Sequence, residues 1–219
     1  MRGAEEPGER LRIEERRAAY LRALLEGDRP AALCAVMHAL DAADVAQVYE
    51  EVIASAMYEV GRMWQENELS VAREHIATSA TAYVMANVYT RCSPAMHGRG
   101  NALVSGMPGE MHQLGVQMVS DILDFDGWRT WSLGTDLLRQ GILAAIEEHG
   151  ATVVGLSATL LPSVKELRLL VGEIKEAFPE TRVMVGGALV SRKFVDPIAF
   201  GADAAVVSLV AARELARGW

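Results

Sequence analysis

Hydrophobic residues in the first part of the chain recur every three or four positions, which is the spacing of an amphipathic helix. Four such stretches follow one another: residues 9–26, a stretch through Leu33 to Leu40, a stretch from Asp41 or Asp44 to Trp64, and residues 71–91. Turn and capping residues separate them, with Ser70 as a candidate N-cap. Four helices with short connections favour an antiparallel arrangement. We therefore predict a four-helix bundle at residues 10–92, preceded by a disordered lead-in at residues 1–9.

The pattern changes after residues 93–100, a stretch of Ser, Pro, His and Gly that we interpret as a linker. Beyond it, short apolar runs of strand length alternate with helical patterns. The predicted strands are 102–104, 128–133, 153–156, 183–185 and 204–209, and the predicted helices are 113–126, 136–149, 163–177, about 190–200, and 211–217. Continuous apolar strands are typical of a parallel sheet covered on both faces. Residues 101–219 are therefore predicted to form a doubly wound five-stranded parallel sheet, Rossmann-like or flavodoxin-like.

Composition narrows the class of protein. The chain has 219 residues, of which 51% are hydrophobic, so a sizeable core can form. A net charge of −8 argues against a nucleic-acid-binding surface. No apolar run reaches membrane-spanning length, and the N-terminus has no signal-peptide core. Cys34 and Cys92 lie in helical patterns without metal-ligand spacing. We expect a reduced cytoplasmic protein that contacts neither nucleic acid nor membrane.

Two chemically active side chains follow the first predicted strand, in the segment Met107 to Gly115. Glu110 and His112 lie two residues apart here, between Gly109 and Gly115. A turn between a strand and a helix is where α/β sheets bind ligands. A carboxylate beside an imidazole is also the arrangement that orients metal-bound histidines. The alternative is a surface loop that happens to contain a histidine.

Two further strand ends carry short motifs. Ser157 and Thr159 follow the third predicted strand, and Gly186 and Gly187 follow the fourth. Hydroxyl groups and paired glycines at one edge of a sheet leave a cleft for a long, polar, nucleotide-like group. Each motif alone is compatible with an ordinary strand-to-helix turn.

Taken together, the motifs resemble the cobalamin-binding domain of methionine synthase, the corrinoid methyl carriers and the cobalamin-dependent mutases. That family carries Asp/Glu-x-His-x-x-Gly, then Ser-x-Leu/Val/Thr, then Gly-Gly. Here 41 residues separate Gly115 from Ser157, and 26 separate Thr159 from Gly186, which is close to the family's spacing. The resemblance implies that this half of the chain binds cobalamin, with Gly115 among the cofactor-binding positions.

The resemblance also implies a role for each motif residue. His112 is expected to be the lower axial ligand of cobalt, replacing the cofactor's own dimethylbenzimidazole, and imidazole suits that metal. Glu110, where the family more often has Asp, is expected to hydrogen-bond the other ring nitrogen. Met111 is expected to touch the corrin. The residues expected around the displaced nucleotide tail are Ser157, Thr159, Gly186 and Gly187.

A third pattern lies in the helical half: Trp64, nine residues, then Glu74 and His75, with Val71 between them. One interpretation is a core tryptophan and a polar pair on a helix surface. The pattern also resembles the light-dependent adenosylcobalamin photoreceptors of the CarH/LitR type. That resemblance implies that Trp64 covers the adenosyl group, that Val71 packs near it, and that Glu74 and His75 supply polar contacts.

From these resemblances we predict a light-responsive adenosylcobalamin sensor that is not an enzyme. Light would cleave the Co–C bond and change self-association or binding to a separate effector. Two departures matter: we expect no winged-helix DNA-binding domain, and Gln65 stands where some photoreceptors have a histidine. The alternative is a corrinoid methyl-carrier protein of a methyltransferase system. A third interpretation is the cofactor-binding subunit of a mutase. It is disfavoured because those subunits are not normally preceded by a helical bundle of this kind.

Overall fold

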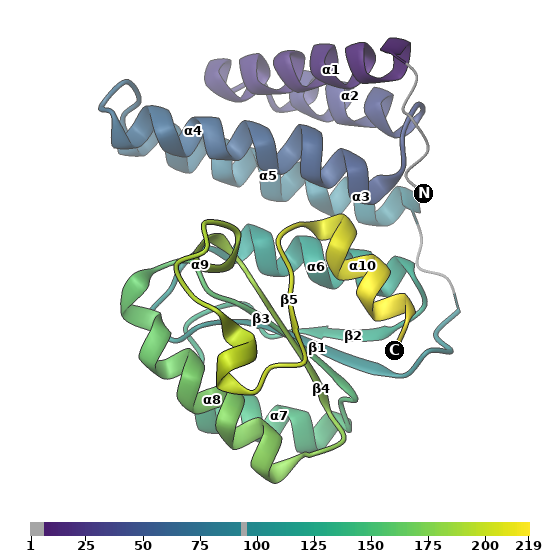
Figure 1. Ribbon diagram of the computed structural model, residues 1–219. Coiled ribbons are helices and arrows are strands. Elements are labelled where there is room, and N and C mark those ends of the chain that lie inside the picture. Colours follow the sequence, from purple (N-terminus) through teal and green to yellow (C-terminus); the bar gives the residue numbers. More distant parts are fainter. Residues whose placement is uncertain (1–6, 93–95) are drawn as a thin grey trace. The chain divides into compact units, whose positions relative to one another are not determined.

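The computed structural model describes residues 7–92 and 96–219 (Figure 1). The chain divides into two compact units, which contain residues 7–92 and residues 96–219 respectively. We describe each unit by itself. None of the helices within the described residues is long and apolar enough to cross a membrane.

The first unit is helical. Its elements are α1 (Pro7–Glu26), α2 (Arg29–Leu40), α3 (Val45–Gln47), the π-helical segment η1 (Val48–Ala54), α4 (Ser55–Gln65) and α5 (Val71–Cys92). Because α3, η1 and α4 follow one another without a break, they form one long helix, and the unit has the four predicted helices. The lead-in predicted at residues 1–9 is in part wrong, since residues 7–9 already belong to α1; residues 1–6 lie outside the described range.

Side-chain caps explain where two of these helices begin. Asp28 accepts a hydrogen bond from the backbone N–H of Ala31 at 2.9 Å, and Pro30 lies in the first turn of α2. Asp44 accepts from the N–H of Ala46 at 2.9 Å and so starts α3. Each carboxylate pairs one of the N–H groups that a helix start leaves without an intrahelical partner.

A polar contact is buried in the largely apolar core of the helical unit. The hydroxyl of Tyr20 lies 2.8 Å from Oγ1 of Thr81, and that Oγ1 lies 3.1 Å from Sδ of Met57. Burial raises the pKa of Tyr20 far above its usual value, so the hydroxyl stays protonated. A neutral, hydrogen-bonded hydroxyl can be buried at little cost.

The second unit is a five-stranded parallel sheet with helices on both faces (Figure 1). Its strands are β1 (Asn101–Gly106), β2 (Arg129–Ser132), β3 (Val153–Ser157), β4 (Arg182–Gly186) and β5 (Ala204–Ala205), in the order β2-β1-β3-β4-β5. Its helices are α6 (Gln113–Phe125), α7 (Arg139–His149), η2 (Leu161–Ser163), α8 (Val164–Ala177), α9 (Ala188–Ser191), η3 (Pro197–Phe200) and α10 (Leu209–Arg217). The predicted fold class is confirmed.

Alternate residues of the central strands enter two separate hydrophobic cores. Leu103 and Val154 pack in the core that includes residues of α7 and α8. Ala102 and Val153 pack in the core that includes residues of α6 and α10. Because neighbouring side chains of a strand point to opposite faces, both faces of the sheet are covered.

Two predicted elements near the C-terminus differ from the structure. The strand predicted at 204–209 ends at Ala205, because Oγ of Ser208 accepts from the N–H of Ala211 at 3.0 Å and begins α10. The helix predicted at about 190–200 is two short elements, α9 and η3. Asp196 accepts from the N–H of Ile198 and caps the second of them.

Candidate functional site

The three sequence motifs of the second unit meet at one edge of the sheet. Gly106, at the end of β1, pairs in register with Ser157, at the end of β3. Ser157 in turn pairs with Gly186, at the end of β4. Since all strands are parallel, the segments that follow these residues leave the sheet side by side. This carboxyl edge is the ligand-binding edge of doubly wound sheets.

His112 lies immediately before α6, in the N-cap position of that helix. Its side chain is exposed, and within residues 7–92 and 96–219 it makes no hydrogen bond or ion pair. An exposed imidazole at the carboxyl edge is available to a ligand. The methionine before it, Met111, is 86% exposed and is equally available.

The carboxylate of Glu110 is buried and bound to the segment after β3. Its two oxygens accept from the N–H of Thr159 at 2.9 and 3.0 Å, and one of them accepts from the N–H of Leu160 at 3.0 Å. The hydroxyl of Ser163 donates to the same oxygen at 2.6 Å. Glu110 is only 2% exposed, so these bonds satisfy a carboxylate that has little access to water.

The hydrogen bond predicted between Glu110 and His112 is therefore absent in this structure. Glu110 points to backbone N–H groups of another loop, whereas the His112 ring is exposed. Backbone donors fixed by a turn offer a buried carboxylate more bonds than a solvent-exposed ring does. In this structure Glu110 therefore binds the loop after β3, and its proposed bond to the His112 ring stays a prediction.

Ser163 is a site residue that the sequence did not reveal. It comes directly before α8 and has the appearance of an ordinary N-cap, yet its side chain makes no capping bond. It is 4% exposed and donates to Glu110. The only signal in the sequence is a hydroxyl residue a few positions after the Ser157–Thr159 motif.

The first turn of α6 approaches the end of β3 at Gly115. A Cβ atom added to Gly115 would lie 4.0 Å from Oγ of Ser157. Ser157 and Thr159 are both half-buried, and the N–H of Thr159 is already bound to Glu110. The structure thus brings Gly115, Ser157 and Thr159 to the same edge as Glu110.

Gly187 allows two backbone segments to lie in direct contact. Its φ angle is +93°, and a Cβ atom there would come within 2.4 Å of the carbonyl oxygen of Ala158. The N–H of Ala158 donates to the carbonyl of Gly186 at 3.0 Å. Only glycine fits at position 187. The paired glycines thus let the loops after β3 and β4 approach closely.

Large apolar side chains are exposed around this edge. Met111 follows β1, Leu138 follows β2, Leu160 and Leu161 follow β3, and Val207 follows β5; all five are exposed. Exposed apolar groups gathered at one edge mark a place where an organic ligand or a partner binds. An accessible imidazole, a glycine-lined contact between loops and an apolar rim together fit a large, flat cofactor that carries a metal.

The residues predicted in the helical half lie in the other unit. Trp64, at the end of α4, is 44% exposed and is not a core residue, and Val71, at the start of α5, is 54% exposed. Nδ1 of His75 lies 2.6 Å from the Glu74 carboxylate, which also accepts from the hydroxyl of Thr78 at 2.8 Å. Trp64, Val71 and His75 are thus each accessible on the helical unit.

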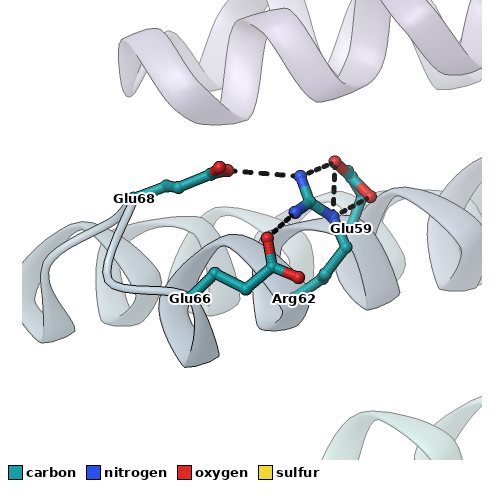
Figure 2. A network of polar contacts seen from close by, with 4 residues as sticks. All are labelled: Glu59, Arg62, Glu66 and Glu68. Carbon is teal, nitrogen blue, oxygen red and sulfur yellow. Dashed lines mark hydrogen bonds and ion pairs between the residues drawn. The ribbon is translucent and has the colours of Figure 1, made fainter.

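An ion-pair network lies at the C-terminal end of α4, the helix that also carries Trp64 (Figure 2). The Arg62 guanidinium contacts Glu59 at 2.7 Å and Glu68 at 3.2 Å, and it also contacts Glu66. Its hydrogen bond to Glu59 lowers the pKa of that carboxyl. Because Glu66 and Glu68 belong to the turn between α4 and α5, the network ties this turn to α4, although exposed ion pairs stabilise a protein only weakly.

A helical unit followed by a doubly wound sheet with an exposed histidine at its carboxyl edge defines a class of two-module, cofactor-binding proteins. Both modules match models described as B12 binding domain, over residues 16–89 and residues 100–208. The chain therefore belongs to the B12-binding domain family, and its cofactor is cobalamin.

The chain is also similar to individual proteins of this kind. The chain is 27% identical over 185 residues to dimethylamine corrinoid protein 1 of Methanosarcina acetivorans, covering 83% of this chain and 86% of the relative. The solved structure of the Methanosarcina barkeri monomethylamine corrinoid protein has the same fold, with a TM-score of 0.77 at 20% identity over 90% of this chain and 94% of the other. A chain in the methanol:cobalamin methyltransferase complex of Methanosarcina barkeri also shares the fold, with a TM-score of 0.51 at 17% identity over 99% and 85%.

These similarities correct the prediction made from the helical half. The similar proteins named above are a dimethylamine corrinoid protein, a monomethylamine corrinoid protein and a chain of a methanol:cobalamin methyltransferase complex, and none of them is a photoreceptor. The prediction of a light-responsive sensor of the photoreceptor type is therefore wrong. The prediction of a cobalamin-binding domain is confirmed. The prediction that the chain is not itself an enzyme is supported, since the relatives are named as corrinoid proteins.

Proposed function

We propose that this protein is the corrinoid subunit of a methyltransferase system. Bound cobalamin supplies a cobalt centre that accepts a methyl group from one partner enzyme and yields it to another. The observation that carries the proposal is the match to a dimethylamine corrinoid protein over 83% of this chain and 86% of that relative. The first candidate for the methyl donor is accordingly dimethylamine or another methylamine. The upper group on cobalt is then methyl in place of the adenosyl group that we predicted.

In this proposal the residues of the second unit hold the cofactor. His112, exposed at the carboxyl edge, would hold the cobalt through its imidazole, and Met111 would lie beside the corrin. Glu110 fixes the loop between β1 and α6 through its bonds to Thr159 and Ser163. The residues proposed to receive the nucleotide tail are Gly115, Ser157, Thr159, Gly186 and Gly187. The proposal is supported by the common edge at which these residues lie.

The helical unit supplies the remaining proposed contacts. We retain Trp64, Val71, Glu74 and His75 as cofactor-contacting residues on the upper side. Their support is the exposure of Trp64 and Val71 and the polar pair formed by Glu74 and His75. In a carrier, the exposed indole of Trp64 would shield the methyl group from water. It could also move aside when a partner enzyme approaches the methyl group. The partners are separate methyltransferase proteins.

Removal of the methyl group tests the proposal. Full-length protein is loaded with methylcobalamin in the dark and mixed with an extract of the cells from which the chain comes. A carrier predicts demethylation faster than that of free methylcobalamin at equal concentration. Heated extract provides the control. Equal rates for bound and free cofactor would contradict the proposal, because the protein would then give no partner enzyme access to the methyl group.

A further inference from the structure

The loop that carries His112 is held by a second carboxylate, on the segment after β2. Oδ1 of Asp136 accepts a hydrogen bond from the backbone N–H of Gly109 at 2.9 Å. Asp136 has a φ angle of +63°, in the left-handed region that side-chain-bearing residues seldom adopt. Aspartate and asparagine tolerate this region better than most residues. The backbone of Asp136 is thus fixed in a conformation that brings its carboxylate to Gly109.

The same segment also packs against the end of β1. The N–H of Gly106 donates to the carbonyl of Gly134 at 2.8 Å. A Cβ atom on Gly106 would lie 2.5 Å from Cγ2 of Thr135, so the contact requires glycine at position 106. The segment 134–136 therefore contacts the His112 loop at two places, where the loop leaves the strand and again at Gly109.

The His112 loop is consequently held from both sides. In the sheet, β1 lies between β2 and β3. On the β3 side, Glu110 binds the N–H of Thr159. On the β2 side, Gly109 binds Asp136. Gly109 lies three positions before His112, and Glu110 lies two positions before it. The two hydrogen bonds therefore restrict the backbone that carries the imidazole.

We propose that Asp136 is a positioning residue that sets how often His112 occupies the lower axial position of cobalt. The inference rests on the proposed role of His112. Without the bond to Gly109, the loop gains backbone conformations, and that gain in entropy favours the state in which the imidazole has left cobalt. The charged acceptor strengthens the bond, while its exposure to water keeps the net contribution modest.

Two substitutions separate the hydrogen bond from the backbone conformation. Asp136→Gly keeps the left-handed backbone accessible and removes the acceptor, whereas Asp136→Asn keeps both an acceptor oxygen and tolerance of this region. Full-length variants are loaded with cobalamin and reduced to the cobalt(II) state. The proteins are produced with ¹⁵N-labelled histidine, whose axial nitrogen splits the electron paramagnetic resonance signal into two lines, whereas the ¹⁴N of the cofactor's own dimethylbenzimidazole splits it into three. The two-line fraction measures how much imidazole is bound, and His112→Ala gives the signal without it.

We expect Asp136→Gly to raise the ratio of unbound to bound imidazole roughly fivefold, and Asp136→Asn to resemble the wild type. An unchanged ratio in Asp136→Gly would overturn the inference while leaving the proposed function intact. An equal rise in both variants would also overturn it, because the amide oxygen should replace the carboxylate. If wild type and His112→Ala gave the same signal, the ligand role of His112 in the proposed function would fail first.

Thermal unfolding of the cofactor-free variants gives the second measurement. We expect Asp136→Gly to unfold close to the wild-type temperature, since the bond to Gly109 lies at the protein surface. A loss of the two-line signal that only accompanies a large loss of thermal stability would assign Asp136 a general structural role and would overturn the inference.

Discussion

The hydroxyl of Ser163 donates to the buried carboxylate of Glu110 across 2.6 Å, and this bond joins the segments that follow β3 and β1. Glu110 stands two residues before the proposed cobalt ligand, so the contact couples the position of His112 to the loop that we propose receives the nucleotide tail. The hydrogen bond between Ser163 and Glu110 therefore links the part of the proposed site that holds cobalt to the part that holds the nucleotide tail.

Removing the Ser163 hydroxyl should destabilise the second unit. Ser163→Ala leaves Glu110, which is 2% exposed, with one donor fewer, and a lost partner of a buried charged group costs about 1–3 kcal/mol. Chemical denaturation of the cofactor-free protein measures the free energy of unfolding. Ser191→Ala is the control, because Ser191 is exposed and its hydroxyl donates a long bond of 3.4 Å to the carbonyl oxygen of Ala188. Equal effects of the two substitutions would show that the Glu110 contact contributes nothing.

A methyl group at position 187 should be much more harmful than one at position 172. Gly187→Ala places a Cβ atom 2.4 Å from the Ala158 oxygen at a φ angle of +93°, which should cost more than about 2 kcal/mol and abolish cobalamin binding. Gly172 lies in α8 with open space around it, so Gly172→Ala should stabilise the protein by about 0.5–1 kcal/mol. Denaturation and cobalamin titration measure both variants, and normal cofactor binding by Gly187→Ala would refute the close-contact argument.

Trp64→Ala should weaken cobalamin binding without unfolding the helical unit. The indole is 44% exposed, so its removal leaves no large cavity, while the proposed contact with the cofactor is lost. We expect cobalamin to dissociate several times faster, which stopped-flow exchange against a cobalamin-binding competitor measures. Tyr58→Ala is the matched control, since Tyr58 lies on the same helix and is 66% exposed. Identical dissociation rates for both variants would remove Trp64 from the site.

Asp203 should make stability depend on acid pH. Burial opposes its ionisation, but a hydrogen bond from the N–H of Val183 at 2.7 Å and an ion pair with Lys175 at 3.0 Å outweigh this and lower the pKa of the carboxyl. A depressed folded-state pKa contributes stability that is present above the unfolded value of about 3.9 and lost as the pH falls through the folded value.

Asp203→Asn should therefore be less stable than the wild type at neutral pH and should lose less stability on acidification. Urea denaturation at neutral pH and near pH 3 measures the difference. Glu180→Gln is the control, because Glu180 is exposed and makes no ion pair or hydrogen bond in the part of the chain that the structure describes. A parallel pH dependence in wild type and Asp203→Asn would contradict the assignment.

Local signals explain which parts of the fold could be predicted. The sequence left Asp41 and Asp44 as possible starts of the third helix, and Asp44 caps α3 from an adjacent position in the chain. The extent of β5 could not be predicted, because Val207 continues the apolar run while Ser208 already caps the next helix. A run of hydrophobic residues does not reveal where a backbone changes direction.

Some features of the candidate site could likewise be predicted from the sequence, and others could not. Sequence spacing placed Ser157 and Gly186 at strand ends, and their pairing in the sheet brings them together. The partner of Glu110 could not be predicted, because Thr159 lies 49 residues away and the bond depends on how two loops fold over one edge. The use of the cofactor could not be predicted either, since an exposed Trp64 suits more than one group on cobalt.

Loading of the methyl group tests the central claim most directly. Full-length protein carrying reduced cobalamin is mixed with dimethylamine bearing an isotopically labelled methyl group and with an extract of its source cells. The bound cobalamin is then isolated in the dark and analysed by mass spectrometry. We predict labelled methyl on cobalamin in the wild type and much less in His112→Ala. No label in the wild type, with any of the methylamines as donor, would contradict a role as methyl carrier in a methylamine system.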